Sequence, residues 1–105
     1  MEYLTECNLN DKLLSELPER GIFSKTLMKN DHTSVVLMQL AKGEDLNEHT
    51  SKYACLLQVL DGKGNLFLNG RQIALNPGKL IFMDPNAPHS VTASENLNFV
   101  LYLLK

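Results

Sequence analysis

The stretch NPGKLIFMDPNAPHSV, residues 76–91, decides the fold predicted for this chain. It contains a turn over 76–78, an apolar run over 80–83, a second turn with two prolines over 85–88, and then His89. Proline and glycine favour tight turns, and a short apolar run between two turns is typical of a strand in a β-rich protein. The rest of the sequence is expected to form strands around this segment.

Runs of apolar and β-branched residues separated by turn residues predict strands on both sides of that segment. These runs cover residues 22–28, 33–40, 55–60, 66–68, 72–75, 90–93 and 97–104. Asn69 and Gly70 join two of them and predict a hairpin, because both central positions of a type I′ turn require a positive φ. Residues 41–48 are interpreted as a polar connection.

The last of these strands, 97–104, is expected to be buried on both faces. A period of two places Leu97, Phe99, Leu101 and Leu103 on one face, and the opposite face is also mostly apolar. The only predicted helix covers residues 8–17, where Asn8 or Asn10 would cap the start and Pro18 follows the end. About eight short strands and one short helix predict an all-β fold, a small β-barrel or two-sheet jelly roll.

Composition and charge exclude several classes of function. The chain has 105 residues, of which 44% are hydrophobic and 21% are charged, as expected for one globular domain. A net charge of −2 without a Lys/Arg cluster argues against a nucleic-acid partner. No apolar run approaches the roughly 20 residues that span a bilayer, so no membrane partner is expected. With two cysteines and no signal-peptide pattern at the start, a cytoplasmic location is predicted.

The spacing of the glycines and histidines resembles the small single-domain cupins. That family carries the motifs Gly-x5-His-x-His-x3,4-Glu-x6-Gly and Gly-x5-Pro-x-Gly-x2-His-x3-Asn. Gly43, His49 and Gly62 stand at the spacings of the first motif, and Gly78 and His89 at those of the second. The resemblance implies a double-stranded β-helix, the cupin barrel, over residues 33–105.

The chain also departs from both motifs. In the first motif, Ser51 stands in place of the second histidine and Cys55 in place of the glutamate, so the motif reads His-Thr-Ser. In the second motif, the substitutions are Asp84 for proline, Asn86 for glycine and Ala93 for asparagine. Two histidines remain of the four metal ligands that the resemblance implies.

The predicted site consists of His49, Ser51, Cys55 and His89. The first three share the same parity along the chain, so an extended segment would direct them to one side, which in a cupin is the barrel lumen. Glu48 is a candidate for orienting His49 by a hydrogen bond. His49 and His89 are candidate ligands for one divalent transition metal (zinc, copper, nickel, iron or manganese), with Cys55 as a third ligand if it ionises. The alternative is a metal-free pocket in which the histidines hydrogen-bond a small molecule.

Two functions follow from these alternatives. The first is a cupin that binds a small molecule in its lumen without a reaction. The second is a metal-dependent cupin enzyme, an oxygenase, isomerase or lyase acting on a small oxygenated substrate. Residues 1–32, with the helix and first strand, are expected to contribute to the interface of a homodimer.

Overall fold

The computed structural model describes residues 3–10 and 20–105 of the chain. Within these residues the backbone forms nine strands and is almost free of helix. The strands are β1 (Ile22–Lys29), β2 (Thr33–Leu40), β3 (Asp45–His49), β4 (Ala54–Asp61), β5 (Gly64–Leu68), β6 (Arg71–Leu75), β7 (Leu80–Met83), β8 (His89–Ala93) and β9 (Leu97–Leu104).

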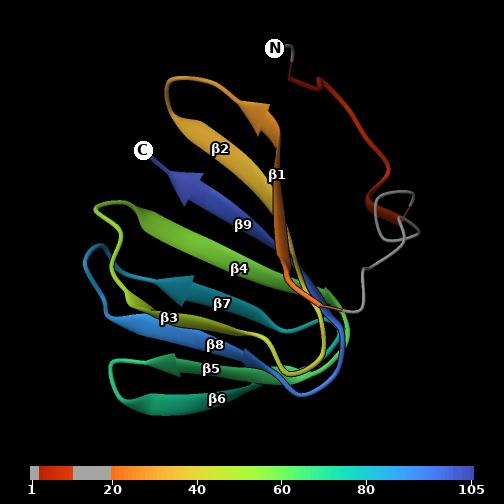
Figure 1. Ribbon diagram of the computed structural model, residues 1–105. Helices are drawn as coiled ribbons and strands as arrows, with labels where there is room; N and C mark the ends of the chain where they lie inside the picture. Colours follow the sequence, from red (N-terminus) through yellow and green to blue (C-terminus); the bar gives the residue numbers. More distant parts are fainter. Residues whose placement is uncertain (1–2, 11–19) are drawn as a thin grey trace.

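The strands form two antiparallel sheets that lie face to face (Figure 1). One sheet has five strands in the order β1-β2-β9-β4-β7, and the other has four in the order β3-β8-β5-β6. Consecutive strands such as β7 and β8 lie in different sheets, which is the arrangement of a jelly roll. The predicted all-β fold is therefore confirmed.

Two hairpins join strands that are consecutive in the sequence, and the second is the one predicted. Strand β1 pairs with β2 from Ile22 to Lys29 with one register shift between Thr26 and Met28. The side-chain oxygen of Asn30 accepts hydrogen bonds from two backbone N–H groups of the turn. Strands β5 and β6 are joined by Asn69 and Gly70, which have φ angles of 52° and 78°. Both positive angles are those of a type I′ turn, so the Asn-Gly signal identifies this connection correctly.

The segment 41–48 contains a strand that sequence analysis missed. Residues from Asp45 form β3, an edge strand that pairs only with β8 in the described part of the chain. Leu46 is its only side chain that is not exposed. A strand with one apolar contact does not show the alternating pattern from which strands are predicted, so the interpretation as a connection was wrong.

The main hydrophobic core lies between the sheets. Its fully buried side chains come from both sheets and include Leu40, Leu57, Leu66, Leu97 and Phe99. Strand β9 is buried on both faces from Leu97 to Val100, as predicted, but its next three residues are only partly buried and Leu104 is exposed.

A second, smaller cluster covers the outer face of the five-stranded sheet. Leu27, Leu37 and Val100 form its buried part, and Cys7 and Leu9 of the N-terminal segment pack against it. The backbone N–H of Leu4 also donates to the carbonyl of Leu27, at 2.8 Å. The N-terminal segment is therefore attached to the sheet by both apolar and polar contacts.

Most of the predicted helix, residues 8–17, lies outside the described residues. Leu9 and Asn10 have helical backbone, and the Asn8 side chain accepts the N–H of Asn10 at 3.0 Å, as a capping residue would. No helix of the described residues is long and apolar enough to cross a membrane. The homodimer contact expected for residues 1–32 stays a prediction.

Candidate functional site

The two histidines face each other because their strands are neighbours. His49 ends β3, His89 begins β8, and the two residues are direct cross-strand partners. The register shifts between Leu46 and His49, where β3 contains one residue more than β8. This bulge turns both Leu46 and His49 toward the lumen, although residues three apart on a regular strand point to opposite faces. The bulge thus positions His49.

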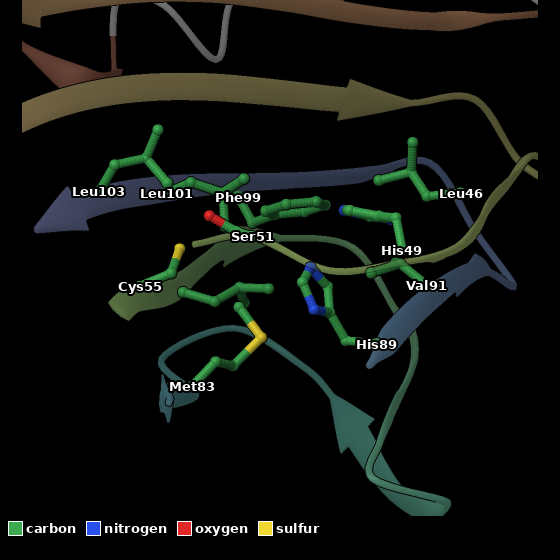
Figure 2. Close-up of a pocket in the computed structure, with 11 residues that line it drawn as sticks. Leu46, His49, Ser51, Cys55, Met83, His89, Val91, Phe99, Leu101 and Leu103 are labelled. Carbon is green, nitrogen blue, oxygen red and sulfur yellow. The ribbon is translucent and has the colours of Figure 1, made fainter. Parts of the chain in front are cut away.

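The imidazole rings of His49 and His89 are in contact. Their centroids are 4.2 Å apart and their planes meet at 62°, which is an edge-to-face arrangement. His49 is exposed and His89 is half-buried, so the pair lies at the mouth of the lumen. Figure 2 shows the two side chains reaching from adjacent strands toward the same space.

Backbone carbonyls fix the orientation of both rings in the same way. Nδ1 of His49 lies 2.7 Å from the carbonyl oxygen of Asn47, and Nδ1 of His89 lies 2.9 Å from that of Ala87. A carbonyl can only accept, so each Nδ1 carries the proton and donates it, which leaves Nε2 as the acceptor of the neutral ring. The orienting partner of His49 is therefore a carbonyl and not the carboxylate of Glu48.

A hydrogen bond joins the two loops at the mouth. The backbone N–H of Asn86 donates to the carbonyl of Ser51 at 2.6 Å. Asn86 has a φ of 65°, a left-handed conformation that asparagine tolerates better than most residues, so it can replace the glycine of the motif. The Ser51 hydroxyl oxygen accepts the N–H of Tyr53 at 3.2 Å, which leaves its hydrogen free to donate.

All four predicted site residues line one cavity of about 80 Å³ between the sheets (Figure 2). This is several times the roughly 10–15 Å³ that one water molecule needs. The other lining residues are apolar: Leu46, Leu57, Met83, Val91, Phe99, Leu101 and Leu103. The alternation along 97–104 would have identified the three lining residues on β9, whereas the bulge that directs Leu46 inward leaves no signal in the sequence.

Ser51 reaches the cavity by a different route from the one predicted. Residues 50–53 form a bend between β3 and β4 and not an extended strand, so parity along the chain does not explain the shared direction. The bend returns the chain from the four-stranded sheet to the five-stranded one. His49 and Cys55 therefore line the cavity from opposite sheets.

Cys55 lies deeper in the cavity as a neutral thiol. Its side chain is 4% exposed, and burial raises its pKa from 9.0 to about 11, although a backbone hydrogen bond from Tyr102 opposes part of this shift. Its sulfur lies 3.6 Å from the carbonyl oxygen of Leu56. Since the thiolate is the form that ligates metals, this thiol would have to lose its proton in order to act as a ligand.

The donor set does not fit the metal site implied by the cupin motifs. No group of three or more His, Cys, Asp or Glu side chains comes together within residues 3–10 and 20–105. Two imidazoles alone provide fewer ligands than the three or four that protein metal sites normally use. We therefore derive no chemistry through a metal at this site.

Comparison with known families identifies the family of this domain. Residues 35–105 match the model of the AraC-like ligand binding domain. The chain belongs to this family. The match covers strands from within β2 to β9 and all four residues of the candidate site, and it supports the cupin resemblance drawn from the motifs. No curated protein matches the chain.

Solved structures show the same fold for this AraC-like ligand binding domain. A cupin superfamily protein from Desulfitobacterium hafniense superposes with a TM-score of 0.85 at 20% identity, over 97% of this chain and 94% of the other. A conserved protein of unknown function from Streptococcus pyogenes superposes with a TM-score of 0.84 at 20% identity, over 100% of this chain and 90% of the other. A cupin 2 conserved barrel domain protein from Leptotrichia buccalis superposes with a TM-score of 0.80 at 30% identity, over 90% of this chain and 46% of the other.

Proposed function

We propose that this domain binds a small, mostly apolar molecule in the cavity, with its polar end held by His49 and His89. The proposal rests on the difference between the mostly apolar cavity wall and the two imidazoles at its mouth. Seven of its eleven lining residues are aliphatic, aromatic or thioether side chains, and the imidazole pair is concentrated at the mouth. Small-molecule sites typically combine such an apolar wall with a few polar groups that fix orientation.

The family supports ligand binding but does not identify the ligand. Its model is described as a ligand binding domain, and it covers the whole cavity. The metal-dependent enzyme considered from the sequence has weaker support, because the described residues supply only two suitable ligands. Binding without a metal is therefore the function that these residues favour.

Nuclear magnetic resonance of methionine methyl groups tests the proposal. Met83 lines the cavity, whereas Met28 packs in the cluster on the outer face of the sheet. In chelator-treated protein labelled with 13C at the methionine methyls, we expect phenol or toluene to shift the Met83 signal in a saturable way and leave Met28 unchanged. Met83→Leu assigns the signal.

A cavity-filling variant provides the control for this experiment. Leu101 lines the cavity and is half-buried, so Leu101→Phe should reduce the available space without removing a fully buried core side chain. We expect its affinity for toluene to fall at least fivefold. The proposal is wrong if neither probe shifts Met83, or if a folded Leu101→Phe protein binds both as well as the wild type.

A further inference from the structure

We infer that the cavity selects neutral molecules that carry a hydroxyl group, such as a phenol or a small alcohol, over carboxylates, amines and ethers of the same shape. This inference rests on the proposed binding function and specifies the chemistry of the ligand. It follows from the hydrogen-bonding state of three side chains and from the absence of charge in the wall.

The imidazole pair requires a donor from the ligand. Both Nδ1 atoms donate to backbone carbonyls, at 2.7 Å for His49 and 2.9 Å for His89, so both Nε2 atoms are acceptors. A ligand atom without a hydrogen, such as an ether oxygen, would exclude water from the half-buried His89 and leave its Nε2 without a partner. An unsatisfied polar group shielded from water costs roughly 1–3 kcal/mol. The rings therefore discriminate between a hydroxyl and its methyl ether.

Ser51 supplies a hydrogen-bond donor, whereas the two histidines supply acceptors. Its oxygen already accepts the Tyr53 N–H at 3.2 Å, so its own hydrogen is available to donate. A hydroxyl group on the ligand can donate to an imidazole and accept from this serine with the same oxygen. The Cys55 thiol lies against the Leu56 carbonyl and is less available for such a contact.

The residues that line the cavity include no permanently charged side chain that could neutralise a charged ligand. None of the cavity-lining residues is Asp, Glu, Lys or Arg. Placing a carboxylate or an ammonium in such surroundings costs far more than burying a neutral hydroxyl, unless an opposite charge accompanies it. A carboxylate would also meet two acceptors, which repel it. Neutral hydroxyl compounds are therefore the class that fits.

Pairs of probes that differ by one group test this selectivity. The Met83 methyl signal gives the dissociation constants of phenol, anisole, toluene and benzoate for chelator-treated protein at pH 8. We expect phenol to bind at least tenfold more tightly than anisole, and benzoate to bind more weakly than toluene. In His89→Phe, which retains a ring but lacks the acceptor, the ratio of phenol to anisole should fall to about one.

The outcomes separate this inference from the function on which it rests. If toluene and anisole bind as tightly as phenol, the cavity binds ligands but does not select a hydroxyl, and only the inference is overturned. Tighter binding of benzoate also overturns it, because the histidines would then act as donors. If no probe shifts Met83, both proposals fail. Should His89→Phe not fold, His49→Phe repeats the test, and the wild-type ratio alone remains decisive.

Discussion

The two ends of the lumen differ in packing, although the same strands form both. At the closed end, Leu40 and Leu97 are cross-strand partners with no exposed surface. The backbone there approaches so closely that a Cβ atom on Gly64 would lie 2.2 Å from the carbonyl oxygen of Thr92. At the open end, His49 and His89 occupy equivalent positions on β3 and β8, but they are exposed and half-buried.

This difference shows how a jelly roll separates stability from binding. Close packing at one end supplies the contacts that hold the two sheets together, since each buried methylene contributes roughly 0.8 kcal/mol. The other end can then keep a cavity and two polar rings at a limited cost in stability. Figure 1 shows the strands of both sheets converging on the right, near the start of β9. We expect substitutions at the two ends to differ accordingly.

The largest difference is expected between two leucines on the same face of β9. Leu97 is fully buried at the closed end, whereas Leu103 is half-buried and lines the cavity at the open end. Leu97→Ala should lower the free energy of unfolding by about 3–4 kcal/mol, because it leaves a cavity in the closed end. Leu103→Ala should lower the free energy of unfolding by only about 1 kcal/mol, since the Leu103 side chain already lines a cavity. Urea denaturation measures both, and equal losses would contradict the division into two ends.

A second comparison uses two glycines with similar backbone angles. Gly62 has a φ of 93°, and a Cβ there would lie 1.8 Å from the carbonyl oxygen of Asn96. We expect Gly62→Ala to lower the free energy of unfolding by on the order of 3 kcal/mol, from strain and overpacking together. Gly78 has a φ of 90° but nothing within 4 Å of its Cβ position, so Gly78→Ala should cost about 1 kcal/mol. If both variants lose a similar free energy of unfolding, backbone strain alone explains the loss and the close approach of Asn96 adds nothing.

Much of the fold was predictable because its signals are local. The alternation along β9 and the Asn69-Gly70 turn depend only on neighbouring residues, and both identify the right structure. The motif spacing related His49 to His89 across forty residues, and the structure brings their rings to 4.2 Å. That these residues bind a ligand stays a prediction.

The remaining features depend on partners that the sequence does not reveal. Strand β3 exists because it pairs with β8, and its bulge is defined only relative to that partner. The tautomer of each neutral imidazole is set by the carbonyl of Asn47 or Ala87, and a residue of any type would provide the same carbonyl. Backbone atoms carry no sequence signal, so the acceptor character of the site could not be predicted.

The reactivity of the Cys55 thiol toward a reagent in solution shows whether solvent reaches this depth of the cavity. Its pKa is raised to about 11 by burial, so in a Cys7→Ser protein we expect no rapid reaction with Ellman's reagent at pH 8. The unfolded thiol ionises near its ordinary value of 9.0, while the folded one stays protonated until about 11. The unfolded state therefore binds fewer protons in this interval, and stability should fall as the pH rises from 9 to 11.

The matched control for this experiment is the double variant Cys7→Ser/Cys55→Ala. It lacks both thiols, so the part of the pH dependence that Cys55 causes should be absent. A rapid, stoichiometric reaction of Cys55 at pH 8 would contradict the prediction and would place this sulfur in the solvent-accessible part of the open end.

The smallest effect is expected at Asn86, where the loops of the open end meet. Its φ of 65° disfavours residues with a Cβ, but asparagine is among those that tolerate it. Asn86→Ala should therefore lower the free energy of unfolding by about 1 kcal/mol, while Asn86→Gly should change it by less than about 0.5 kcal/mol. Both variants keep the backbone N–H that donates to Ser51, so thermal or urea denaturation isolates the conformational cost. If glycine destabilises the protein as much as alanine, contacts of the Asn86 side chain stabilise the loops at the mouth. The open end would then contribute more to the free energy of unfolding than its exposure indicates.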